Sequence, residues 1–341
     1  MHARVSDIAT ANPETSYSQD EMLGLLGLEG DRFAETIFAR GGIDKRHLDV
    51  TADKLGTTLQ ERATGTEELL VQLATEAIDA LDVDPQEVGT LITAAYYSLG
   101  GPTIAHQLVA HYDMDPSTDK YHVAGVGCAS AVPLFKLAGQ ALRDHPDRPA
   151  LVVGVDSMSG VMSRINGSDA RPKAVSLSLF ADGCSAALLR SSDDPAATGP
   201  AVRATRVHQV PGTLDAVGFQ HARDDSFFRI GRELPAVAKT LGPLVDDFLA
   251  DQGRTRADIA HWLVHPGGRA ILDGVQEAVS LSDEQIAVSR DVLARYGNMG
   301  TPTSFYVLHE TIVQREPRPG DLGLMITIGP GVTAGFMLLE W

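Results

Sequence analysis

Strand-like and helix-like segments alternate along the whole chain, and this alternation restricts the fold more than any other feature of the sequence. Val88–Ala95 and Ala150–Val155 are short apolar runs that predict buried strands. Glu67–Leu81 carries apolar residues at helical spacing, and Ala129–Leu142 predicts a second helix that is more fully buried. Alternation of this kind predicts an α/β fold with helices covering the sheets.

The second half of the chain repeats the pattern of the first. Its expected strands are His261–Val264, Leu322–Ile328 and Thr333–Leu339. Its expected helices are Arg269–Val279, Asp283–Tyr296 and Thr303–Val313. In each half one functional-looking residue follows a Gly and opens a helix: Cys128 in the first half and Asn298 in the second. In each half a Gly-containing turn later leads into a strand. The repetition predicts an internal duplication. We place the boundary in the polar stretch 191–200, which gives halves 1–195 and 196–341 within one compact body.

Charge and cysteine content exclude several classes of function. The formal net charge is −17, with 45 acidic and 28 basic residues, so the chain would repel nucleic acid and anionic membranes. A local group of Lys and Arg side chains would therefore have to bind any anionic substrate. Two cysteines, Cys128 and Cys184, cannot build a disulfide framework and fit a reducing compartment. Without a run of about 20 apolar residues or a leader-like start, we expect a cytoplasmic protein.

The segment Val123–Ala131 is the most informative part of the sequence for chemistry. Small residues on both sides of Cys128 allow a sharp turn from strand to helix. At a helix start, unsatisfied N–H groups and the helix dipole favour a thiolate, the form that accepts an acyl group from a thioester. Cysteine is also among the most buried residue types, so a structural role stays open for Cys128 taken alone.

His265 and Asn298 are further candidates for catalysis. His265 follows an expected strand, and the Gly pair after it allows close approach of the backbone. A histidine at a strand end is often structural, so His265 taken alone does not identify a catalytic site. Asn298 lies at an expected helix start, where Asn is a preferred cap, and a cap is compatible with a catalytic role.

Two other classes of protein fit part of the pattern. Val126–Ser130 imitates the nucleophile elbow of an α/β-hydrolase, which would need an acid such as Asp215 or Asp224. Gly125–Ser130 also imitates a dinucleotide-binding loop, but it lacks the last Gly. The hydrolase alternative does not explain the two later Gly-rich motifs, Gly297-Asn298 and Gly329-Pro330-Gly331.

Taken together, the motifs resemble those of the type III polyketide synthases, the chalcone-synthase-like enzymes of the thiolase superfamily. The segments that carry the resemblance are Gly41–His47, Gly127–Ala129, Leu179–Gly183, His265–Leu272, Gly297–Met299 and Gly329–Thr333. It spans nearly the whole chain, from about Gly41 to Trp341. The resemblance implies a thiolase fold, in which two duplicated halves form an α-β-α-β-α arrangement.

A related family is the runner-up. The chain length and the ending Gly335–Trp341 lean toward ketoacyl-ACP synthase III, but that family usually carries His-Gln-Ala-Asn where this chain has His265-Pro266-Gly267-Gly268. The polyketide synthase resemblance therefore ranks first. A ketoacyl-ACP synthase III-like enzyme, or an acyltransferase that acts without condensation, remains the alternative.

The first-ranked resemblance implies a decarboxylative Claisen condensation through an acyl-cysteine. Cys128 would take an acyl group from an acyl-CoA or acyl carrier protein thioester. Decarboxylation of a malonyl thioester would produce an enolate, and His265 and Asn298 would donate hydrogen bonds to its oxygen. His265 would also polarise the Cys128 thiol. This chemistry needs no metal and no redox cofactor.

The resemblance also implies aromatic residues around the acyl pocket. Phe180 matches a Phe that gates this pocket and Phe228 matches its companion, although both side chains could simply be core aromatics. Tyr96 and Tyr97 stand where small hydroxyl residues often line the cavity. The larger Tyr side chains predict a narrower pocket and argue against a large multi-ring product.

Further residues are candidates for the rest of the substrate. Lys45 and Arg46 would contact the CoA phosphates, unless they form a solvated surface pair. The glycine-rich turns supply the remaining substrate-binding candidates, Gly267, Gly268, Gly329, Pro330 and Gly331.

The resemblance implies a homodimer. The apolar segment Tyr121–Val126 would pair with the same segment of a second subunit and so cover an exposed edge. The loop Leu99–Pro102 would then lie near the partner's active site. An apolar strand could equally be internal to the sheet.

Overall fold

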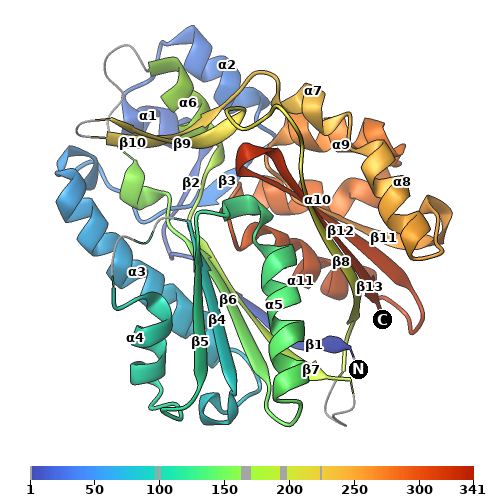
Figure 1. The fold of residues 1–341 in the computed structure, drawn as a ribbon. Helices are drawn as coiled ribbons and strands as arrows, with labels where there is room; N and C mark the ends of the chain where they lie inside the picture. Colours follow the sequence, from blue (N-terminus) through green and yellow to red (C-terminus); the bar gives the residue numbers. More distant parts are fainter. Residues whose placement is uncertain (1, 97, 99–100, 163–169, 193–197, 223–224) are drawn as a thin grey trace.

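The computed structural model describes residues 2–96, 98, 101–162, 170–192, 198–222 and 225–341. Within these residues one sheet has the strand order β11-β12-β13-β8-β1-β7-β6-β4-β5 (Figure 1). Its strands are β1 (Ala3–Ala11), β4 (Thr90–Ala95), β5 (Asp119–Ala124), β6 (Ala150–Asp156), β7 (Gly183–Ser191), β8 (Ala201–Gln209), β11 (Ile259–Val264), β12 (Leu322–Gly329) and β13 (Thr333–Glu340). Two short ribbons pair β2 (Ser16–Ser18) with β3 (Lys45–His47), and β9 (Val217–Ala222) with β10 (Asp225–Ile230).

The helices surround this sheet. They are α1 (Gln19–Leu26), α2 (Arg32–Arg40), α3 (Leu59–Asp79), α4 (Ile104–His111), α5 (Ala131–Asp144), α6 (Ala170–Leu179), α7 (Leu234–Ala238), α8 (Gly242–Asp251), α9 (Arg269–Val279), α10 (Asp283–Tyr296) and α11 (Thr303–Arg315).

The two halves of the chain repeat one strand arrangement, as the sequence predicts. In the first half β1 is antiparallel to β7, β7 is antiparallel to β6, and β6 is parallel to β4. In the second half β8, β13, β12 and β11 follow with the same directions. The corresponding strands also occur in the same order along the chain, which is the signature of a duplication.

Three hydrophobic clusters define five layers. α3 and α4 cover the outer face of the first half's strands, and α8 and α9 cover the outer face of the second half's strands. α5 and α11 lie between the two halves, where the ring centroids of Phe135 and Phe305 are 5.1 Å apart. The expected α-β-α-β-α arrangement of the thiolase fold is confirmed.

The two halves form one body. β1 and β8 pair at Arg4 and Ala201, which joins the two sets of strands, and the cluster between the halves draws side chains from both. The predicted boundary after residue 195 falls within 193–197, outside the described residues, and stays a prediction. No helix in the described part of the chain is long and apolar enough to cross a membrane.

Several expected elements begin or end at different residues. α9 and α10 have the predicted bounds. α3 begins before the predicted helix 67–81, because Thr58 and Glu61 form a capping box ahead of its first turn. The helix expected over 129–142 begins at Ala131, after the 3-10 turn Gly127–Ala129.

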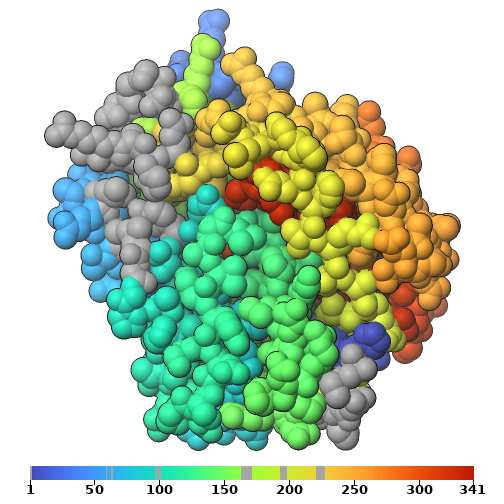
Figure 2. Space-filling view, in the orientation of Figure 1, coloured from blue at the N-terminus to red at the C-terminus, as the bar shows by residue number. Residues whose placement is uncertain are grey.

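One end of the molecule carries a cap above the strands. Figure 1 shows α1, α2, α6, β9 and β10 together at this end. Their apolar side chains form a cluster that includes Met158, Phe180 and Phe228. In the same orientation, Figure 2 shows part of the C-terminal segment (red) in a gap between green and yellow segments.

Candidate active site

The predicted nucleophile lies at a sharp turn between β5 and α5. Gly125 and Gly127 have φ values of 78° and 55°, in the left-handed region that glycine tolerates best. A Cβ atom at position 127 would come within 2.8 Å of the Tyr96 ring, so the turn needs glycine there. The turn brings Cys128, in the middle of the 3-10 turn Gly127–Ala129, to the carboxyl end of β5.

His265 follows β11 and is held by its backbone and by its ring. Its N–H donates to the Ile326 carbonyl (2.8 Å), which continues the pairing of β11 with β12. Its Nδ1 lies 3.3 Å from the Ser304 hydroxyl, whereas Nε2 has no partner among the described residues. The side chain is almost fully buried, and burial lowers the pKa of His265 to about 3. Burial therefore favours the neutral form of the imidazole.

Asn298 follows α10 and is locked to the first half of the chain. Its N–H donates to the Leu179 carbonyl, and its carbonyl accepts from the Ala181 N–H, both at 2.9 Å. The side-chain Oδ1 accepts from the Gly300 N–H at 2.9 Å. This bond sets the orientation of the amide, because Nδ2 is then the atom that can donate. Nδ2 lies 3.4 Å from the Gly267 carbonyl.

The Cys128 thiol contacts Asn298 in the resting site. Sγ donates to Oδ1 of Asn298 at 3.7 Å. Part of the cysteine residue is exposed, but its sulfur is desolvated, and burial followed by the charge of Asp156 raises the pKa of Cys128 to about 12. Desolvation of the sulfur thus opposes the thiolate that the turn is expected to favour.

The three candidate side chains border one cavity of about 40 Å³. Other residues that the sequence analysis named also line it, namely Phe180, Phe228, Gly267, Gly329 and Pro330. Apolar residues that the sequence analysis did not name complete the wall, namely Val217, Ile230, Leu234, Ile271 and Ile328. These are ordinary aliphatic side chains, and no sequence signal separates them from the core. The cavity thus gathers groups from both halves of the chain.

An aromatic cluster forms one side of this cavity. The Phe228 ring lies with its centroid 4.8 Å from Phe180, 4.7 Å from Tyr96 and 5.0 Å from Phe219. Tyr96 thereby backs the cavity wall next to the nucleophile turn. Tyr97 lies outside the described residues.

Besides Tyr96, which packs behind Phe228, four of the predicted substrate contacts do not line the cavity. Arg46 is fully buried, and its guanidinium donates to the carbonyls of Leu177 and Phe180, so the prediction that it contacts CoA phosphates is wrong. Burial also lowers the pKa of Arg46 to about 9. Its neighbour Lys45 is exposed on β3 and lines none of the cavities described here. Gly268 borders a neighbouring groove, and Gly331 lies beside Gln209 and Leu214.

That neighbouring groove, of about 430 Å³, adjoins the cavity through residues that border both, Ile230, Gly267 and Ile271. Three exposed arginines line it, Arg40, Arg232 and Arg269. They come from distant parts of the chain, so their proximity has no signature in the sequence. We call this groove the arginine groove.

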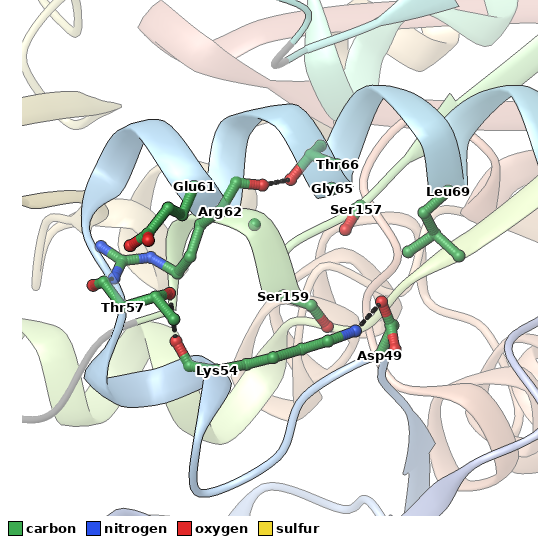
Figure 3. Close-up of a pocket in the computed structure, with 11 residues that line it drawn as sticks. Asp49, Lys54, Thr57, Glu61, Arg62, Gly65, Thr66, Leu69, Ser157 and Ser159 are labelled. Carbon is green, nitrogen blue, oxygen red and sulfur yellow. Dashed lines mark hydrogen bonds and ion pairs between the residues drawn. The ribbon is translucent and has the colours of Figure 1, made fainter.

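A more polar cavity of about 110 Å³ lies between α3 and the segment that holds Ser157 and Ser159 (Figure 3). Its walls hold an ion pair between Lys54 and Asp49 at 2.5 Å, and Arg62 donates to the Thr57 carbonyl. Cys128, His265 and Asn298 do not line it. We therefore treat it as separate from the candidate site.

Comparison with known proteins agrees with the fold and the site. Residues 5–217 match the family described as FAE1/Type III polyketide synthase-like protein, and residues 202–340 match the C-terminal domain of chalcone and stilbene synthases. The 3,5-dihydroxyphenylacetyl-CoA synthase of Amycolatopsis orientalis is 29% identical, over 99% of this chain and 93% of that protein. The 1,3,6,8-tetrahydroxynaphthalene synthase of Streptomyces peucetius subsp. caesius is also 29% identical, with the same coverage of both chains.

A solved structure has the same fold. PKS-I from the brown alga Ectocarpus siliculosus superposes with a TM-score of 0.91 at 24% identity, over 99% of this chain and 98% of that chain. Fold and comparisons together define a condensing enzyme of the thiolase superfamily. More narrowly, the chain belongs to the family of type III polyketide synthases, and its reaction is the decarboxylative condensation of an acyl starter with a malonyl-type extender.

This result removes one of the alternatives that the sequence left open. The α/β-hydrolase prediction is wrong, because the family match covers the chain on both sides of Cys128. Of its two nominated acids, Asp215 is exposed and lies outside the cavity lining, and Asp224 lies outside the described residues.

Proposed function

We propose that Cys128, His265 and Asn298 carry out the condensation. The observation that supports this assignment is that the three side chains, from three elements and both halves, border one cavity. Cys128 Sγ attacks the carbonyl carbon of the starter thioester, and the carrier thiol leaves. This first half-reaction is an acyl transfer to cysteine, so the enzyme is also an acyltransferase.

In the second half-reaction the malonyl-type extender binds with its thioester oxygen between Nε2 of His265 and Nδ2 of Asn298. Loss of carbon dioxide leaves an enolate, whose negative charge develops on that oxygen, where two preorganised donors stabilise it best. The enolate carbon attacks the acyl carbon, and the Cys128 thiolate departs. Each step is served by groups of this chain, without a metal or redox cofactor.

We propose acyl-CoA and malonyl-CoA, rather than carrier-protein thioesters, as the substrates. The arginine groove adjoins the cavity and holds Arg40, Arg232 and Arg269. In a chain of net charge −17, such a group of guanidinium side chains offers a local contact for the phosphates of CoA. Arg40 and its companions thus take the role that the sequence analysis gave to Lys45 and Arg46.

We further propose that the starter is short. The cavity next to Cys128 measures about 40 Å³, and the Tyr96 ring packs behind Phe228, which lines its wall. Such a wall leaves little room for a long acyl chain. A compact product with few extensions fits this site.

The remaining expectations stay proposals. β5 is an edge strand of the sheet, and Tyr121 on it is 43% exposed, which supports pairing of β5 across a two-fold axis. A cytoplasmic location also stays a prediction from composition.

Radiolabelled malonyl-CoA with a panel of acyl-CoA starters tests the assignment. We expect labelled product and carbon dioxide from the wild-type enzyme, and neither above background from Cys128→Ala. Cys184→Ser is the matched control, because Cys184 is buried in β7 away from the cavity lining. Transfer of the starter without decarboxylation, or full activity of Cys128→Ala, would contradict the proposal.

A further inference from the structure

The first turn of α11 supports both groups that we propose to bind the enolate oxygen. The Thr303 hydroxyl lies 3.4 Å from Asn298 Oδ1, and the hydroxyl of the next residue, Ser304, lies 3.3 Å from His265 Nδ1. Both hydroxyl residues are at most 1% exposed. Neither residue carries a role predicted from the sequence.

We infer that Ser304 is a positioning residue for His265, whose hydroxyl accepts the Nδ1 proton so that Nε2 faces the Cys128 thiol as a proton acceptor. This inference rests on the proposed function of His265 and Cys128. The ring is wholly enclosed, Ser304 is the hydrogen-bond partner of Nδ1, and Nε2 has none among the described residues. A neutral imidazole carries one proton, so a proton held at Nδ1 leaves the lone pair at Nε2.

The proton balance of acyl loading follows from this arrangement. The thiol proton moves from Sγ to Nε2 while Sγ forms its bond to the thioester carbon. The bond from that carbon to the CoA sulfur then breaks, and the departing CoA thiolate takes a proton from water. The imidazole is left with protons on both nitrogens. Its Nδ1–H donates to Ser304 and its Nε2–H becomes the donor for the extender's thioester oxygen.

Ser304 matters because the site offers little else to stabilise charge on the ring. Burial alone lowers the pKa of His265, without a compensating carboxylate. Among the described residues, Tyr96, after β4, and Asp156, at the end of β6, are titratable groups that interact with Cys128, and the charge of Asp156 raises the pKa of Cys128. A hydrogen bond to the protonated ring is therefore the main local support for proton transfer from the thiol.

The test is the pH dependence of Cys128 alkylation by iodoacetamide, followed by intact-protein mass spectrometry. Removal of the hydroxyl in Ser304→Ala should move the profile to higher pH and slow alkylation at pH 7 about tenfold, the effect of losing one hydrogen bond to a charged group. Condensation should fall by a similar factor. Ser304→Thr keeps the hydroxyl and should keep the wild-type profile.

Ser289→Ala is the matched control. Ser289 is also fully buried, and its hydroxyl accepts the N–H of Val264, directly before His265, without touching the ring. A general loosening of the site would shift Ser289→Ala and Ser304→Ala alike. An unshifted profile in Ser304→Ala overturns the inference.

Two further variants make the outcomes distinct. If Ser304→Ala fails to fold, Ser304→Thr decides, since a shifted profile in that variant overturns the inference and an unshifted one supports it. His265→Ala separates the inference from the proposed function. If His265→Ala leaves the profile unchanged, the proposed pairing of His265 with Cys128 fails. If His265→Ala shifts it and Ser304→Ala does not, only the role of Ser304 fails.

Discussion

The backbones of Phe180 and Asn298 form a parallel bridge, although the two residues belong to different halves of the chain. The bridge consists of two hydrogen bonds of 2.9 Å, from Asn298 to Leu179 and from Ala181 to Asn298. It fixes the aromatic wall of the cavity relative to the amide that we propose to bind the enolate oxygen. A shift of either half would therefore disturb both the acyl pocket and the condensation step.

The first prediction concerns the two cysteines. Incubation with an acyl-CoA should give one acyl adduct on Cys128, because its thiol borders the cavity, whereas Cys184 is enclosed in β7 and its burial raises its pKa well above the usual range. Peptide mapping after intact-mass analysis locates the adduct. Cys128→Ala should abolish it and Cys184→Ser should not. An adduct on Cys184 would refute the assignment.

The second prediction concerns Asn298. Asn298→Ala should lower malonyl decarboxylation by about 10²–10³-fold, the usual effect of removing one oxyanion donor. Acyl loading of Cys128 should survive, because we propose that His265 accepts the thiol proton, and the contact of the thiol with Asn298 Oδ1 is long, at 3.7 Å. Release of labelled carbon dioxide and the mass of the acyl-enzyme measure the two steps separately.

A half-buried asparagine with a structural role provides the control for Asn298. Asn12 donates to the Asp182 carbonyl and accepts from the Tyr306 hydroxyl, so Asn12→Ala should affect stability more than chemistry. His265→Ala should impair both loading and decarboxylation. Near-wild-type condensation by Asn298→Ala would be incompatible with its proposed role.

The third prediction concerns product length. Tyr96→Ala should enlarge the acyl pocket and lengthen the main product or broaden the range of starters, because the ring packs at 4.7 Å on Phe228. Tyr96→Phe keeps the ring and should keep the product. Chromatography with mass detection identifies the products. Tyr112→Ala removes a tyrosine from the end of α4, beside Asp79, and should change no product.

The fourth prediction concerns the arginine groove. Arg40→Ala and Arg232→Ala should raise KM for acyl-CoA several-fold, because each removes a cation from a groove that is open to solvent. The same variants should handle N-acetylcysteamine thioesters normally, since these carry no phosphates. Arg143→Ala, on exposed α5 surface, is the control. Equal losses with both kinds of thioester would argue against a phosphate contact.

The fifth prediction concerns assembly. Light scattering at micromolar concentration should give about twice the monomer mass of 36.3 kDa. Tyr121→Glu should weaken the dimer, because it places a charge on the exposed edge strand β5. If the dimer forms, a bulky residue at Gly101 should change product length without affecting Cys128 loading. A wild-type mass near that of the monomer would contradict the first step.

Local sequence patterns determined several helices, the turn at the nucleophile and the family of this protein. The helices Arg269–Val279 and Asp283–Tyr296 have the bounds that their periodicity predicts, because the apolar face of each is encoded within the segment, and Ser282 caps the second helix. The same holds for the turn at Cys128, where glycine is needed for a left-handed backbone. The order of motifs also sufficed to predict the family.

Only the tertiary structure decided how distant segments meet. Arg46 and Lys45 are adjacent in sequence and equally basic, yet one is buried against backbone carbonyls and the other is exposed. The proximity of Ser304 to His265 and the gathering of arginines in one groove likewise depend on packing between remote elements. The desolvation of a side chain likewise depends on packing between remote elements. The pKa of Cys128 is set by the burial of its sulfur, which depends on every element packed around it, and no local motif records that.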